Sequence, residues 1–296
     1  MPGQLTRTAI SAQPEWLREV PERVGDRRLP DGAVVLFTGC GTSFHAALAC
    51  GPASQALELV LGSAPAADVL VAISHEGETR LTREALRRFQ GETWLITGAP
   101  ESPIAQEVDH VVVATPAVEE SYCHTASYTC AVAAGRALRG EDVSGLAADV
   151  FRELDAPPLG ASDHERFVVA GAGRDTATAL ESVLKLREGA HVAAEAHHTE
   201  QLLHGHLAAI DPGVRCFVLE GEGRAAERAV DAMRALGELG CDALLVPTTH
   251  PVVDIVRFQL LACDLAEARG VDPDMIRWDE DPWDRARQAQ DFMADP

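Results

Sequence analysis

The chain contains the same local unit twice, and this repeat restricts the possible folds more than any other feature of the sequence. Residues 33–38 (AVVLFT) form a short apolar run that ends at Gly39-Cys40-Gly41 and leads into SFHAALAC, a small-residue stretch with a helical pattern. Residues 167–170 (FVVA) lead in the same way into Gly171-Ala172-Gly173 and TATALESVLKLRE, with the two glycine turns 132 positions apart. Each unit predicts a strand, a tight turn and a helix N-terminus.

Further strands are predicted at matching places after both units. VLVAIS (69–74) corresponds to CFVLEGEGR (216–224), and TWLITG (93–98) corresponds to ALLVPT (243–248). Strands that alternate with helices at this spacing require right-handed crossovers and a mainly parallel sheet. The predicted fold class is therefore α/β, with two tandem αβα sandwich domains.

The length of 296 residues also suits two domains, at roughly 150 residues each. We place them at 1–148 and 149–296, with a linker over about 140–163, where ELDAPPLGASD supplies a proline pair, a glycine and polar residues. A helix around 15–20 (EWLREV) precedes the first domain, and a tail rich in Asp and Trp follows Asp272.

The composition limits which binding partners and which cellular compartment we expect. The formal net charge is −21, and such a field repels nucleic acid and anionic membrane surfaces. The seven cysteines are widely spaced without a C-x-x-C pair, which indicates reduced side chains rather than disulfides or a zinc site. The start MPGQLTRTAI lacks a signal-peptide h-region, so we expect a cytoplasmic protein with no membrane span.

Hydroxyl side chains follow the first two predicted strands. Thr42 and Ser43 come directly after Gly41 at a helix N-terminus, where the helix dipole favours an anion, although simple N-capping is the alternative explanation. Ser74 and Thr79 lie in the next loop, SHEGET. Because ligands of open parallel sheets bind outside the carboxyl ends of the strands, both loops would face one ligand.

A charged trio marks the helix predicted in the second half. Glu181, Lys185 and Glu188 are spaced i, i+4 and i+7, so all three project from one face. Spacing alone favours a solvated helix that carries an ion pair. A nearby stretch, 191–206, holds five histidines, and Glu200 and His204 stand one helical turn apart, as in some zinc sites.

Four strings in order give the chain a family resemblance. They are Gln13-Pro14, GCGTS (39–43), SHEGET (74–79), and ESVLKLRE (181–188) together with EAHHTEQLLHGHLAAID (195–211). In these the chain resembles the sugar isomerase (SIS) domain family, and more narrowly the tandem-domain phosphosugar isomerases and deaminases related to the isomerase half of glucosamine-6-phosphate synthase. The resemblance implies flavodoxin-like domains.

The resemblance also implies residue roles. Hydroxyls of Ser43, Ser74 and Thr79 would hold a sugar phosphate, Glu188 would move a proton between C1 and C2 through a cis-enediol, and His204 would open the sugar ring from the neighbouring subunit of a homodimer. Lys185 would keep the carboxylates of Glu181 and Glu188 ionised. The remaining substrate-binding positions are Gly41, Thr42, His75 and Glu76. No cofactor and no metal are implied.

Several departures from the family pattern leave the reaction open. Ser-Gln-Ser-Gly-Glu-Thr has become Ser74-His75-Glu76-Gly77-Glu78-Thr79, which puts a carboxylate beside the expected phosphate. Glu76 either pairs with Arg80 or accepts a hydroxyl or ammonium group of an unphosphorylated sugar. Thr-Lys-Ser appears as Thr125-Ala126-Ser127, the tripeptide HGP as His204-Gly205-His206, and the tail has no lysine.

Two classes of function remain. One is an enzyme, which we expect to be a free-standing aldose–ketose isomerase or amino-sugar deaminase without a glutaminase domain. The other is a non-catalytic sugar-phosphate sensor of the kind found in transcription regulators. The retained Glu181, Lys185, Glu188 and His204 favour the enzyme.

Overall fold

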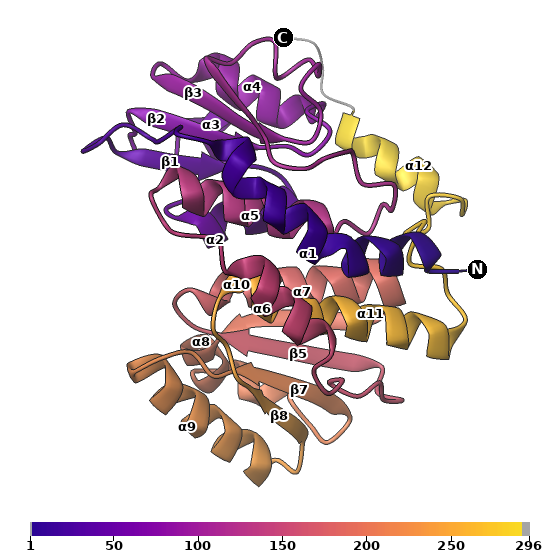
Figure 1. Ribbon diagram of the computed structural model, residues 1–296. Helices are drawn as coiled ribbons and strands as arrows, with labels where there is room; N and C mark the ends of the chain where they lie inside the picture. Colours follow the sequence, from indigo (N-terminus) through magenta and orange to yellow (C-terminus); the bar gives the residue numbers. More distant parts are fainter. Residues whose placement is uncertain (1, 292–296) are drawn as a thin grey trace.

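The computed structural model describes residues 2–291, and these contain two four-stranded parallel sheets (Figure 1). The first sheet has the order β1-β2-β3-β4 and consists of β1 (Val35–Thr38), β2 (Val69–Ile73), β3 (Glu92–Thr97) and β4 (His110–Val113). The second has the order β6-β5-β7-β8 and consists of β5 (Arg166–Gly171), β6 (Ala193–His198), β7 (Val214–Leu219) and β8 (Asp242–Val246). The predicted α/β class with parallel sheets is confirmed.

Alternate residues of the strands enter different cores, as the twofold period of a strand requires. In β2, Val69, Val71 and Ile73 pack with helices α2 (Thr42–Cys50) and α5 (Ala126–Leu138). Leu70 and Ala72 face the opposite side and pack with α3 (Ala56–Leu61) and α4 (Arg80–Arg88). All five residues of β2 are buried, which explains its uninterrupted apolar sequence.

The second sheet is covered in the same way. Phe167 and Phe217 pack with α7 (Asp175–Ala190) and α11 (Val256–Arg269), whereas Val168 and Val218 pack with α8 (Thr199–Leu203) and α9 (Arg224–Glu238). One continuous apolar cluster includes residues of α2, α5, α7 and α11. These helices therefore form a shared layer between the two sheets, as Figure 1 shows.

The two glycine turns match in detail. A Cβ at Gly39 would lie 2.7 Å from the carbonyl carbon of Ser43, and a Cβ at Gly171 would lie 2.7 Å from the carbonyl oxygen of Asp175. Gly41 and Gly173 both have positive φ, 57° and 60°, which side-chain-bearing residues rarely adopt. Both turns need glycine at the same two positions for the same two reasons, so the sequence repeat is also a structural repeat.

The strand order shows that the two halves resemble each other in more than the elements predicted from the sequence. β6 lies on the outer side of β5, and the same position beside β1 is taken by a single parallel bridge between Phe37 and Ala53. β6 was not predicted as a strand, because its sequence AAEAHH is small and polar, as an edge strand permits. β4 was not predicted either.

Helices differ from the prediction at the N-terminus and between the sheets. The predicted short helix is the middle of α1 (Gln4–Val24), which continues through Pro14 and Pro21 because its apolar face is buried against α5, α6 and α11. The predicted linker contains α6 (Leu146–Leu154), so a division at 148/149 falls inside a helix. The division into 1–148 and 149–296 stays a prediction.

The remaining elements are short. They are η1 (His206–Ala209), α10 (Pro251–Asp254), α12 (Trp283–Arg287) and η2 (Gln288–Asp291). Among residues 2–291, no helix has the length and apolar character needed to cross a membrane.

Candidate active site

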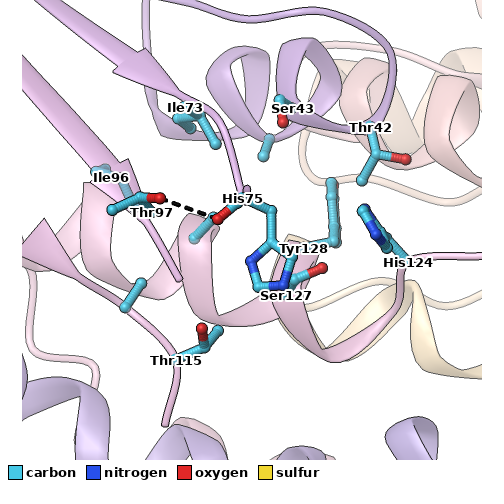
Figure 2. Close-up of a pocket in the computed structure, with 13 residues that line it drawn as sticks. Thr42, Ser43, Ile73, His75, Ile96, Thr97, Thr115, His124, Ser127 and Tyr128 are labelled. Carbon is cyan, nitrogen blue, oxygen red and sulfur yellow. Dashed lines mark hydrogen bonds between the residues drawn. The ribbon is translucent and has the colours of Figure 1, made fainter. Parts of the chain in front are cut away.

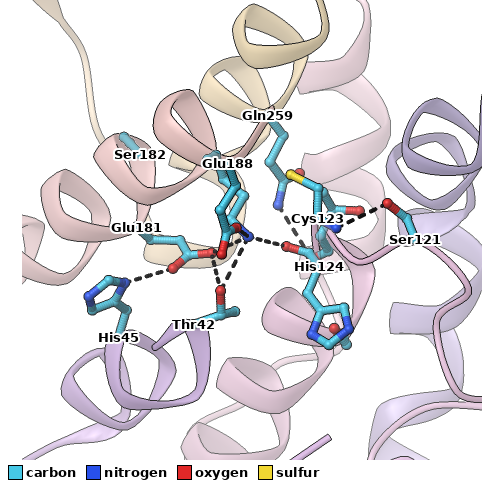
Figure 3. A network of polar contacts seen from close by, with 12 residues as sticks. Thr42, His45, Ser121, Cys123, His124, Glu181, Ser182, Glu188 and Gln259 are labelled. Carbon is cyan, nitrogen blue, oxygen red and sulfur yellow. Dashed lines mark hydrogen bonds and ion pairs between the residues drawn. The ribbon is translucent and has the colours of Figure 1, made fainter. Parts of the chain in front are cut away.

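A buried lysine connects the two halves of the molecule at the helix layer. The Lys185 ammonium on α7 lies 2.7 Å from Glu188 Oε2 and 3.4 Å from Glu181 Oε1. It also donates to Thr42 Oγ1 at 3.2 Å and to the His124 carbonyl oxygen at 2.9 Å (Figure 3). The predicted common face of the helical trio is thus confirmed, and its cation reaches two segments of the first half.

Burial decides between the two explanations of the trio. The side chains of Glu181 and Lys185 are both 0% exposed, so the solvated surface helix is wrong. Burial alone would lower the pKa of Lys185, but the carboxylates of Glu188 and Glu181 outweigh it and hold that pKa well above its usual value. The lysine is therefore a permanent buried cation.

The two carboxylates differ in their partners. Glu181 accepts a hydrogen bond from Thr42 Oγ1 at 3.2 Å, and its other oxygen lies 2.8 Å from His45 Nδ1. Glu188 has Lys185 as its described partner and keeps 24% of its side chain exposed. Burial raises the pKa of Glu188, and Lys185 offsets part of this effect. Of the two, Glu188 is the carboxylate that a ligand can reach.

Tail residues line the opening beside Glu188. Ile276, Arg277 and Trp283 surround it together with Arg187, His191 and Val192. Arg277 donates from Nε to His191 Nδ1 at 3.0 Å, and its guanidinium stacks on the Trp283 ring at 4.1 Å. The tail without lysine therefore still supplies a cation to this side of the site.

The predicted hydroxyl loops lie at the carboxyl ends of neighbouring strands. Thr42 and Ser43 begin α2 after Gly41, and no side chain caps this helix, so the N-capping explanation is wrong. Ser74 Oγ lies 3.4 Å from Thr79 Oγ1, and Thr79 precedes α4 without capping it. Two helix N-termini without a side-chain cap thus lie beside hydroxyl groups at this edge of the sheet, a position that favours an anion.

Glu76 lies exposed in the second of these loops. Its pKa is raised by partial burial and by the nearby Glu78 carboxylate. The loop therefore presents two acidic side chains close to the expected anion position.

A small pocket beneath these loops contains two histidines (Figure 2). The rings of His75 and His124 meet edge to face, with centroids 5.2 Å apart, and the backbone N–H of Glu119 donates to His75 Nε2 at 2.8 Å. Burial lowers the pKa of both imidazoles to about 4, with a further lowering of His75 by His124 and of His124 by Lys185. Both rings are neutral at pH 7.

Glu119 is a buried residue that the sequence did not indicate. Its carboxylate accepts hydrogen bonds from Thr125 N, Thr125 Oγ1 and Ser127 N, each at 2.8 Å. It therefore occupies the N-terminus of α5, the position at which an anionic ligand would otherwise bind. His124 and His45 were also missed, because an isolated histidine in an irregular segment or beside a small-residue run carries no periodic signal.

His204 is placed apart from this cluster within the single chain. It follows α8 with its side chain 70% exposed, and its Nε2 lies 2.8 Å from Glu200 Oε1. Arg228 Nε donates to the other oxygen of Glu200 at 2.8 Å. The predicted one-turn spacing of Glu200 and His204 brings their side chains into contact. Across residues 2–291, no three His, Cys, Asp or Glu side chains are arranged to hold a metal ion.

Together, the two parallel sheets define a doubly wound α/β protein, and the polar cluster between its halves is the candidate site. A family model described as the SIS domain matches residues 49–138 and 161–267. The chain therefore belongs to the SIS domain family, as its motifs indicated.

Individual relatives agree with this assignment. The glutamine–fructose-6-phosphate aminotransferase (isomerizing) of Aeropyrum pernix is 29% identical over 92% of this chain and 53% of its own length. The chain thus spans about half of this curated relative. Among solved structures, the glucosamine-6-phosphate deaminase of Thermotoga maritima has a TM-score of 0.73 at 22% identity, covering 92% of this chain and 97% of that chain. The tagatose-6-phosphate ketose/aldose isomerase of Escherichia coli has a TM-score of 0.74 at 17% identity, covering 93% of this chain and 97% of that chain.

The buried lysine predicts a large and pH-dependent stability effect. Lys185→Met leaves the Glu181 and Glu188 carboxylates without their cation, so the free energy of unfolding in urea at pH 7 should fall by about 3–5 kcal/mol. The loss should shrink as the pH falls, because protonated carboxyls need no counter-ion. The double variant Glu181→Gln/Lys185→Met should recover part of the loss.

The control is Arg234→Met, which removes a cation that is 70% exposed on α9 and should change stability little. Equal stability of Lys185→Met and the wild type at pH 7 would contradict the assigned role of the cluster.

Proposed function

We propose that this protein is an enzyme that interconverts the aldose and ketose forms of a sugar phosphate at Glu188. The observation that carries the proposal is the pairing of one accessible carboxylate with a buried lysine, at 2.7 Å, where the same lysine donates to Thr42 of the first hydroxyl loop. A carboxylate held in this way can take a proton from one carbon of an open-chain sugar and return it to the next, through a cis-enediol. Relatives that act on sugar phosphates support the substrate class.

Other residues of the chain would bind the substrate and open the sugar ring. The Lys185 ammonium keeps the carboxylates ionised and holds a substrate oxygen near C1 or C2, as its contact with Thr42 suggests. Hydroxyls of Ser43, Ser74 and Thr79, which lie at or near the N-termini of α2 and α4, bind the phosphate. His204 opens the sugar ring from the partner subunit of a homodimer, because within one chain it follows α8 and contacts Glu200 rather than the Lys185 cluster.

Deamination of an amino-sugar phosphate is the second candidate. The structural neighbour from Thermotoga maritima is a glucosamine-6-phosphate deaminase. The same carboxylate and lysine suit both reactions, since each begins with proton transfer at C1 or C2. Release of ammonia from glucosamine 6-phosphate, measured beside ketose formation, distinguishes them.

Glu188→Gln tests the proton-transfer step. The amide keeps the shape but removes the base, so turnover should fall by roughly a hundredfold or more while sugar phosphate still binds. The measurement is incorporation of solvent deuterium at C1 or C2, with Glu227→Gln, an exposed residue of α9, as the matched control.

The pH dependence of the wild-type rate is a second test of Glu188. Because the pKa of Glu188 is raised, the wild-type rate should fall on the acid side at a pH above the ordinary carboxyl value of 4.5. Undiminished deuterium exchange in Glu188→Gln would refute the assignment.

His204→Asn tests the shared site. The variant should slow cyclic substrates far more than an open-chain analogue, because only the former need ring opening. Mixing it with Glu188→Gln subunits should restore some activity, since hybrid dimers contain one site with both native residues. If subunit exchange is shown independently and no activity returns, His204 does not act across an interface.

Glu76→Ser tests whether the substrate carries a phosphate. A carboxylate about 4 Å from a phosphate charge opposes it by about 1 kcal/mol per unit charge even at the dielectric constant of water. The variant should therefore leave sugar-phosphate affinity unchanged or improve it. Loss of activity on an unphosphorylated sugar, with no gain on its phosphate, would instead identify the unphosphorylated sugar as the substrate.

A further inference from the structure

Three buried hydroxyl groups without partners belong to residues that line the small pocket beside His75 and His124. They are Thr115 Oγ1, Ser127 Oγ and Tyr128 Oη, on residues that are 1%, 4% and 1% exposed. All three residues line the pocket (Figure 2). Buried polar groups are nearly always hydrogen-bonded, so three open hydroxyls around one cavity indicate that a hydrogen-bonding occupant belongs there.

Neighbouring residues are arranged to keep this cavity open and polar. A Cβ at Gly98 would lie 2.5 Å from His75 Cε1 and 2.6 Å from Thr115 Oγ1, so a larger residue would displace both groups. Because His75 Nε2 accepts from the Glu119 N–H, its proton sits on Nδ1 in the neutral ring. The imidazole is thus fixed in orientation and tautomer, although no catalytic step of the proposed function uses it.

The pocket offers an anion no compensating charge. None of the thirteen residues that line it is lysine, arginine, aspartate or glutamate, and the two imidazoles are neutral. The nearby Lys185 ammonium is already bound to Glu188, Thr42 and the His124 carbonyl oxygen. An anion placed here would be buried without a counter-ion, which is strongly unfavourable.

Size and chemistry indicate an uncharged alcohol. The cavity measures about 20 Å³, enough for roughly one water-sized group. Serine, threonine and tyrosine hydroxyls can each donate and accept, as can an alcohol. The pocket also borders Thr42, which receives a hydrogen bond from Lys185, so an occupant reaches the edge of the catalytic cluster.

We propose that the pocket formed by Thr115, Ser127 and Tyr128 binds one uncharged hydroxyl group of the sugar. This inference rests on the proposed function and makes it more specific: the pocket selects a hydroxyl of the sugar chain, and a phosphate stays outside at the loop hydroxyls of Ser74 and Thr79, with Ser43 at the border between the two. The pocket is then a specificity site that orients the sugar relative to Glu188.

Tyr128 provides a direct probe, because the chain has only two tyrosines. Tyrosine labelled with ¹³C at the ring carbon that bears the hydroxyl gives two NMR signals, and Tyr122→Phe assigns them. We use the Glu188→Gln protein so that the sugar is not turned over, and add fructose 6-phosphate or inorganic phosphate. The Tyr128 signal should move with fructose 6-phosphate and stay in place with inorganic phosphate.

Two results would overturn the proposal in this experiment. The first is an equal shift with inorganic phosphate, which would identify the pocket as an anion site. The second is an unmoved Tyr128 signal with fructose 6-phosphate.

Removal of single hydroxyls separates ligand binding from structural support. Ser127→Ala, Thr115→Val and Tyr128→Phe delete groups that have no protein partner, so stability to urea should stay the same or rise. Each should weaken fructose 6-phosphate binding by roughly three- to tenfold in calorimetry. The matched control is Thr125→Val, which deletes a hydroxyl bonded to Glu119 and should lower stability.

A pocket that holds only a structural water would give the opposite pattern: the three variants would lose stability and keep their sugar affinity. That result would overturn the proposal while Glu188-dependent deuterium exchange stayed intact. Failure of the proposed function is separate from this, because it would appear as absent exchange in a wild-type protein whose Tyr128 signal still responds to the sugar.

Discussion

The ammonium of Lys185 is the interaction on which the architecture of the site depends. It is the only lysine in the chain, it is fully buried, and it joins α7 to Thr42 of α2 and to the carbonyl oxygen of His124. An ion in this position is costly to desolvate, so it must keep its partners at hydrogen-bond distance. That requirement fixes how the second half of the molecule sits against the first, and it brings Glu188 close to Thr42 of the first hydroxyl loop.

The groups around the candidate site act electrostatically over short distances, although the whole chain has a net charge of −21. His75 and His124 are neutral, Glu119 occupies the N-terminus of α5, and the open N-termini of α2 and α4 provide only partial positive charge. Recognition must then come from short-range hydrogen bonds rather than from a long-range field. A site of this kind distinguishes ligands by the position of hydroxyl and phosphate oxygens.

Much of this arrangement could be predicted from the sequence, and the limits have a physical cause. The glycine turns and the i, i+4, i+7 trio follow from backbone geometry, so their places and common face were correct. β6 could not be recognised, because an edge strand does not need the apolar sequence of a buried one. The pocket around Tyr128 and Thr115 is formed by residues from separate segments, and only their burial in the folded chain shows that their hydroxyls lack partners.

The asymmetry between the two carboxylates explains how one of them can serve as a base. One cation faces two acids, so the cluster carries an excess of negative charge, and the acid with fewer partners is the easier to protonate. Glu181 has Thr42 and His45 as well as Lys185, whereas Glu188 has Lys185 as its described partner. Glu181 thus holds the lysine in place, and its own charge helps to raise the pKa of Glu188, the residue exposed to the ligand. Under the proposed function, a carboxylate that does not contact the substrate would in this way adjust the basicity of the proposed base.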